Sequence, residues 1–130
     1  MKRLVIGAML AVALAFPAVA LAEKINSDVS IHKTFDQDRI YGVVQSPAHK
    51  CERNREIVLF YRPFQSPDFA PIASELTDSL GQYDFEAQLM KRAPAVEEGQ
   101  YFARATRKSA GADVCRRDDS RVIEVAGVGG

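Results

Sequence analysis

The sequence predicts an all-β fold, a seven-strand antiparallel Greek-key sandwich, and three observations point to it. Short runs rich in Val, Ile, Phe and Tyr recur along the chain. Several of them alternate apolar with polar residues, which places successive side chains on opposite faces of a strand. Turn residues separate the runs, and no stretch after residue 22 shows a sustained 3.6-residue apolar period. This combination is typical of a sandwich or barrel.

The expected strands follow from these runs in chain order. In the first, Val29, Ile31 and Phe35 alternate with polar residues, so His32 should face solvent. The third is nearly all apolar, which is typical of a central strand covered on both faces. The expected strands span residues 29–35, 39–45, 56–62, 71–76, 82–87, 100–107 and 121–126.

The segments between the runs predict little helix. Residues 86–92 could form at most a helical turn, which Pro94 would end. Residues 46–55 and 108–120 are expected to be loops longer than a tight hairpin, and residues 127–130 a frayed tail.

The first 22 residues read as a helical signal peptide. Lys2 and Arg3 precede an apolar run over residues 4–15, and Ala20-Leu21-Ala22 supplies small residues for cleavage. The alternative is a membrane span, but Pro17 interrupts the run and a span needs about 20 apolar residues.

Cleavage there would leave residues 23–130 as a single β-sandwich domain, secreted or periplasmic, without stable membrane insertion. The whole chain has no formal net charge, and the leader carries two Lys and Arg residues and no acid. Nucleic-acid binders usually carry a basic excess, so a nucleic-acid partner is not expected.

The chain has only two cysteines, Cys51 and Cys115. In an oxidising compartment such a pair is most simply a disulfide. The loops that hold them would lie at the same end of an antiparallel sandwich, and the bridge would contribute about 4 kcal/mol. The alternatives are a metal site or a reactive thiol. The chain has no CxxC motif and only two histidines, so neither a metal nor another cofactor is expected.

Short motifs add a resemblance. They are Ile40-x-Gly42-x-Val44, Ile57-x-Leu59, Leu76-Thr77-Asp78-x-x-Gly81-x-Tyr83-x-Phe85 and Gly99-x-Tyr101-x-Ala103. Over most of residues 39–125 the order resembles the small secreted β-sandwiches of the transthyretin-like group, including carboxypeptidase regulatory-like and collagen-adhesin B-type domains. The resemblance implies an Ig-like or transthyretin-like sandwich, with Thr77-Asp78 and Gly81 forming a turn before the fifth strand. Such a fold carries many functions.

Activities known in that group find no matching residues in this chain. Lys33 could supply the amine of an isopeptide crosslink, but the last strand has no Asn or Asp to receive it. The C-terminus lacks the Tyr-Arg-Gly-Ser signature of hydroxyisourate hydrolases, and there is no Trp for sugar stacking as in starch-binding sandwiches.

Two surfaces are candidates for binding. The disulfide would bring together Lys50, Arg53, Arg116 and Arg117 as a possible anion-binding cluster, unless neighbouring acids neutralise it. The outward-facing Val58, Phe60 and Phe102 would form a partner-binding patch, unless the loop over residues 63–69 covers them.

Catalysis is not expected, because neither His32 nor His49 has a nearby Ser or Cys arranged as a nucleophile. The sequence therefore favours a small exported, non-catalytic interaction module that binds a protein partner through a sheet face or loop end. The alternative is a sandwich that recognises a glycan or anionic polymer at the basic loop end.

Overall fold

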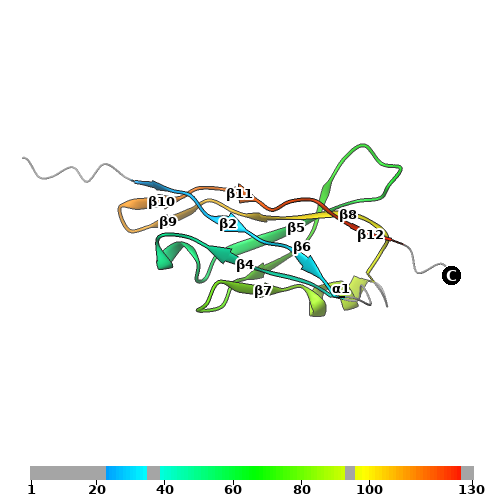
Figure 1. Ribbon diagram of the computed structural model, residues 1–130, viewed down its shortest axis with the longest axis horizontal. Helices are drawn as coiled ribbons and strands as arrows, with labels where there is room; N and C mark the ends of the chain where they lie inside the picture. Colours follow the sequence, from blue (N-terminus) through cyan, green and yellow to red (C-terminus); the bar gives the residue numbers. More distant parts are fainter. Residues whose placement is uncertain (1–22, 35–38, 93–95, 127–130) are drawn as a thin grey trace, which may run out of the picture.

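A computed structural model describes residues 23–34, 39–92 and 96–126. The expected signal peptide, the 127–130 tail, Phe35 and Pro94 lie outside the described residues. Within them the chain forms an all-β sandwich with one short α-helix, as Figure 1 shows. Each of the seven expected runs contains a strand.

The strands fall into three hydrogen-bonded groups. The first layer contains β2 (Asp28–Val29), β3 (His32–Lys33), β4 (Ile40–Gln45) and β7 (Gln82–Asp84). The second layer contains β5 (Glu56–Arg62), β6 (Ala70–Leu76), β8 (Gly99–Ala105), β11 (Asp118–Asp119) and β12 (Ile123–Val125). The third group, a small sheet at one end, contains β1 (Lys24–Ile25), β9 (Lys108–Ala110) and β10 (Asp113–Cys115).

The core lies between the two layers and is built by the alternation seen in the sequence. Along β4, Ile40, Gly42 and Val44 are buried while Tyr41 is exposed. Strand β8 shows the same period. The buried cluster comprises Val29, Ile31, Ile40, Val44, Ile57, Leu59, Tyr83, Phe85, Leu89, Tyr101, Ala103, Ala105, Ile123 and Val125.

A helix interrupts the expected fifth strand. Strand β7 ends at Asp84, whose carboxylate accepts a hydrogen bond of 2.8 Å from the backbone N–H of Glu86. Helix α1 (Glu86–Arg92) then runs for two turns and buries Leu89. The expectation of a strand over 82–87 and at most a helical turn was therefore wrong at this boundary. A carboxylate just ahead of a helix can satisfy an N–H group that has no partner within it.

Residues 108–120 were expected to form a loop, but they contain three short strands. They form a hairpin of β9 and β10 with the register Ala110 to Asp113, followed by β11. Gly111 occupies the turn with φ +65°, a conformation that a two-residue hairpin turn favours and that glycine adopts freely. Figure 1 shows β9 and β10 continuing the line of β8, β11 and β12, so the two arms form one long hairpin.

Strand β1 adds a parallel pair to an otherwise antiparallel structure. Lys24 is in register with Val114, and Ile25 with Cys115. The backbone N–H of Val114 donates to Glu23 and that of Arg116 donates to Ile25. The N-terminal end of the described chain is thereby fastened to the hairpin.

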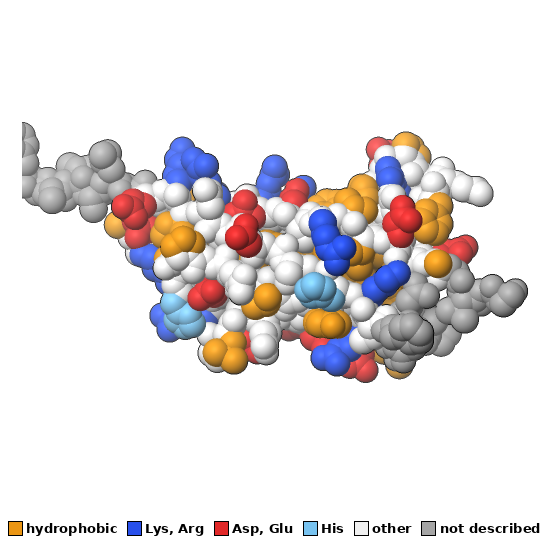
Figure 2. Space-filling view, in the orientation of Figure 1, with side chains coloured by type: hydrophobic (Ala, Val, Ile, Leu, Met, Phe, Trp, Pro, Cys, Tyr) orange, Lys and Arg blue, Asp and Glu red, His pale blue; other side chains and the backbone are white. Residues whose placement is uncertain are grey.

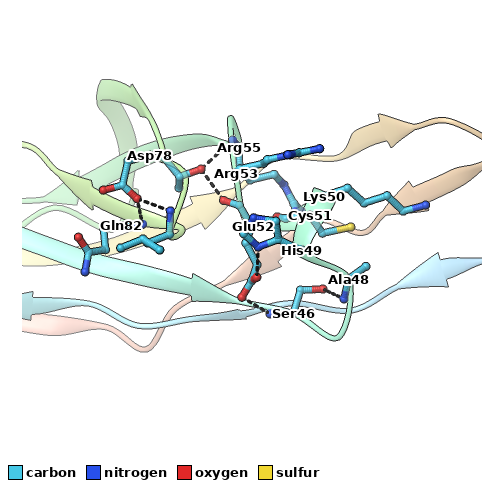
Figure 3. A network of polar contacts seen from close by, with 12 residues as sticks. Ser46, Ala48, His49, Lys50, Cys51, Glu52, Arg53, Arg55, Asp78 and Gln82 are labelled. Carbon is cyan, nitrogen blue, oxygen red and sulfur yellow. Dashed lines mark hydrogen bonds and ion pairs between the residues drawn. The ribbon is translucent and has the colours of Figure 1, made fainter.

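The turn before β7 has the geometry that the sequence predicts. Gly81 has φ +79°, and a Cβ there would lie 2.5 Å from the carbonyl oxygen of Val44. Asp78 Oδ1 accepts hydrogen bonds of 2.9 Å from the backbone N–H groups of Leu80 and Gln82. In return, the N–H of Asp78 donates to the carbonyl of Gln82 at 2.9 Å. Asp78 and Gln82 are labelled in Figure 3.

Candidate functional site

The structure confirms the disulfide between Cys51 and Cys115. Their Cα atoms lie 5.6 Å apart, both side chains are fully buried, and 64 positions separate them in sequence. The bridge joins the short 3₁₀ turn η1 (His49–Cys51) to β10. It therefore fastens the small end sheet to the connection between β4 and β5.

A polar network holds η1 in place, and Figure 3 shows it in close-up. The Glu52 carboxylate accepts hydrogen bonds from the backbone N–H of Ser46 at 3.2 Å and from His49 Nδ1 at 3.0 Å. The buried Thr77 hydroxyl donates to the Glu52 carbonyl and accepts from the N–H of Arg55 at 2.8 Å. His49 thus has a structural contact at the surface.

Beside the disulfide, the Arg55 side chain is completely buried. Its Nε donates to the carbonyl of Thr106 at 2.7 Å, and Nη1 donates to the carbonyl of Cys51 at 2.9 Å. Nη1 also reaches Ser27 Oγ at 3.2 Å, and Nη2 donates to the carbonyl of Arg116 at 2.5 Å. Burial lowers the Arg55 pKa, and Asp118 opposes this. The guanidinium therefore connects four segments of the chain. Two of them are the junction between β8 and β9 and the junction between β10 and β11.

Alternation along β10 then decides which side chains face outward. Because the half-cystine Cys115 is buried, its neighbours Val114 and Arg116 lie on the opposite face. Lys24 is in register with Val114 and shares that face. The carbonyl of Arg116 is held by Arg55 and its N–H by Ile25, so the backbone that carries this side chain is fixed on both sides.

These residues surround a hollow of about 480 Å³ on the outer face of the end sheet. We call it the basic groove. Its lining is Lys24, Arg107, Val114, Arg116 and Arg117. None of the four cations forms an ion pair with a carboxylate in the described residues. Figure 2 shows Lys and Arg side chains projecting from this edge of the molecule.

The groove contains two of the four cations expected to bind anions. Arg116 and Arg117 line it, whereas Lys50 and Arg53 do not. Lys50 is engaged with Asp113, and together with the backbone N–H of Glu23 it holds the pKa of that carboxyl below its ordinary value. This agrees with the expectation that some acids neutralise the cluster locally.

Arg53 contributes its backbone rather than a groove side chain. Lys108 Nζ donates to the carbonyl of Arg53 at 2.8 Å and to that of Lys50 at 3.0 Å. Burial lowers the Lys108 pKa, and the charges of Arg53 and Arg55 lower it further. Lys108 therefore ties β9 to η1.

Sequence reasoning missed Lys24 and did not assign Arg107 to the site. Arg107 could be placed only once the hairpin was known, because a buried Cys115 then implies that the residue next to its partner Lys108 faces outward. No comparable signal marks Lys24, which reaches the groove only through the parallel pairing of the two-residue strand β1.

The expected partner patch is partly covered. Val58, Phe60 and Phe102 are all half-buried on the outer face of β5 and β8. The rings of Phe60 and Phe102 stack with centroids 4.8 Å apart. Arg104 Cζ lies 4.6 Å from the Phe60 centroid, and Phe69 packs edge-on against Phe102 at 4.9 Å. An arginine and one loop aromatic thus take up part of the surface.

Comparison with protein-family models, curated proteins and solved structures finds no match to this chain. Among the described residues, no group of three or more His, Cys, Asp or Glu side chains is arranged to hold a metal ion. No helix in the described ranges is long and apolar enough to cross a membrane. A buried disulfide fits an oxidising compartment.

Proposed function

We propose that the protein is an exported, non-catalytic binding module that takes an anionic polymer in the basic groove. The observation that carries this proposal is the set of four cations around one hollow, without an ion-paired carboxylate among the described residues. Like charges gathered in this way repel one another, and a bound polyanion would offset the repulsion.

The supporting geometry favours a polymer over a small ion. The groove lies on an exposed three-stranded surface rather than in a closed cavity, and its only apolar lining residue is Val114. Within the described residues, the Lys and Arg side chains of the groove are not held in fixed positions by ion pairs. They can therefore follow the repeated negative charges of a polymer. Export agrees with the disulfide and with the expected signal peptide.

The test is retention on immobilised heparin and on immobilised polygalacturonate, a sulfated and a carboxylated probe. We expect the protein to elute with rising salt, because counterions compete with the four cations. Arg116→Ser should elute at lower salt. The matched control Lys91→Ser removes the same charge from an exposed position on helix α1 and should elute closer to the parent protein. Equal elution of the two variants, or no retention of the parent, would contradict the proposal.

A protein partner at the β5–β8 face is the second candidate function. The stacked Phe60 and Phe102 rings are only partly buried, and Leu76 on the neighbouring strand is 58% exposed. Capture of a protein from periplasm or culture supernatant that Phe60→Ser abolishes, while Phe64→Ser and Arg116→Ser do not, would favour this function over polyanion binding.

A further inference from the structure

A second hollow lies elsewhere, along the outer face of the first layer and past β7 to β6. It has a volume of about 760 Å³. We call it the sheet-face groove. Its lining is Ser30, His32, Arg39, Tyr41, Gly42, Val43, Glu75, Leu76, Asp78, Gln82, Tyr83 and Asp84. None of these residues lines the basic groove.

Strand register arranges the groove in two rows. Tyr41 pairs with His32 on one side and with Asp84 on the other, so these three side chains form one row across three strands. Val43 pairs with Gln82 and accepts the Ser30 N–H at 3.0 Å, which defines the next row. Residues two apart on a strand lie about 7 Å from each other. The two rows therefore form a surface wide enough for one ring-sized ligand unit.

The first row supplies an aromatic platform. The rings of His32 and Tyr41 lie with centroids 5.6 Å apart, at an interplanar angle of 38°. Tyr41 is 36% exposed and His32 is exposed. Aromatic rings held by a sheet offer apolar faces to C–H groups at little conformational cost.

The charged side chains of the groove already have hydrogen-bond partners. Arg39 Nε donates to Asp84 Oδ2 at 2.6 Å, and its guanidinium lies 5.4 Å from the Tyr41 ring centroid. Asp78 is occupied by the turn, and Glu75 accepts from Gln88. Among the described lining residues, the Tyr41 hydroxyl, the Gln82 side-chain amide and the His32 imidazole form no hydrogen bond or ion pair.

We propose that the sheet-face groove binds a neutral saccharide, one sugar ring resting on Tyr41 and His32 and its hydroxyls reaching Gln82 and Asp84. An aromatic platform flanked by a few fixed, planar hydrogen-bonding groups suits a ligand that has an apolar ring face and a polar edge. Arg39 is paired with Asp84, and the two further carboxylates, Asp78 and Glu75, disfavour an anionic ligand. This site is separate from the proposed polyanion site.

The test is depletion of the protein by insoluble cellulose, chitin and starch in high salt, which suppresses binding at the basic groove. We expect at least one of the three to bind. Tyr41→Ala should weaken that binding by about tenfold, because the platform is lost, while Tyr41→Phe should retain most of it. Phe64→Ala removes a half-exposed aromatic outside the groove and should leave binding unchanged.

Gln82→Ala is the second variant, since its side chain faces solvent and the substitution leaves the core intact. It should weaken binding several-fold, with an unchanged unfolding midpoint. Arg116→Ser should bind these polysaccharides as the parent does, which separates this proposal from the proposed function. Absence of binding to all three, or equal binding by the parent, Tyr41→Ala and Gln82→Ala, would overturn it.

Discussion

The buried guanidinium of Arg55 holds the carbonyl oxygen of Arg116, with Nη2 donating to it at 2.5 Å. One residue therefore joins the interior of the sandwich to the backbone that carries a groove cation. Replacing Arg55 would leave the carbonyls of Thr106 and Cys51 without their donor as well.

Arg55→Ala should lower the free energy of unfolding by more than about 3 kcal/mol, because it creates a cavity and leaves several buried acceptors unsatisfied. Arg55→Lys should recover only part of this loss, since one ammonium cannot span acceptors that a planar guanidinium reaches together. Denaturant titration measures both. Arg53 is exposed, so the control Arg53→Ala should change the free energy of unfolding by at most about 0.5 kcal/mol. A small effect of Arg55→Ala would show that the network does not stabilise the fold.

Reduction of the disulfide should lower stability by about 2–5 kcal/mol, because the bridge constrains a long loop in the unfolded chain. The measurement is the denaturation midpoint with and without reductant, alongside intact mass. Cys51→Ser/Cys115→Ser should match the reduced protein and should not respond to reductant. Two free thiols in protein isolated from an oxidising compartment would contradict the assignment.

Acid should remove a contribution that depends on Asp113. The pKa of this carboxyl is lowered in the folded state, first by Lys50 and then by the Glu23 N–H. The ionised form is therefore favoured on folding, so the stabilisation is complete above the ordinary value of 3.8. This stabilisation should be lost as the pH falls below 3.8 and through the lower pKa that Asp113 has in the folded state. The stability difference between the parent and Asp113→Asn should be constant near neutrality and shrink in that acid range. A difference that grows on acidification would contradict the ion pair.

Two glycines offer a matched comparison. A Cβ at Gly42 would lie 2.1 Å from the Ser30 carbonyl oxygen and 2.5 Å from the Tyr83 hydroxyl, which are hydrogen-bonded to each other. Gly42→Ala should therefore cost about 2 kcal/mol or more. At Gly111 no atom lies within 4 Å, so Gly111→Ala should cost only the backbone penalty of φ +65°, about 1 kcal/mol. Thermal or denaturant unfolding ranks the pair, and an equal cost would show that packing around Gly42 can relax.

Periodicity predicted the layers because the strands that build them bury every second side chain. It failed where strands gain stability from partners rather than from their own pattern. The hairpin over Lys108–Ala110 and Asp113–Cys115 is short and has no long apolar alternation, and it is held by its pairing with β1 and by the disulfide. The charge of Arg55 gives no sign of its burial. Its burial depends on carbonyls contributed by distant segments, which no local pattern reveals.

The candidate sites, like the fold, could be predicted from the sequence only in part. Two cysteines allow one intramolecular pairing, and that pairing located the basic end of the molecule. Which cations are free there depends on ion pairs such as that of Lys50 with Asp113. The platform of His32 and Tyr41 requires the register between β3 and β4 and could not be found from either run alone.

The contact between Asp78 and Gln82 also bears on solubility. In the described residues β7 pairs only with β4, so its other side is an open edge that could recruit a strand from another molecule. Asp78 occupies both backbone hydrogen-bonding groups of Gln82 on this side, by accepting from its N–H and donating to its carbonyl. A turn residue thereby keeps part of the β7 edge from pairing with a strand of another molecule.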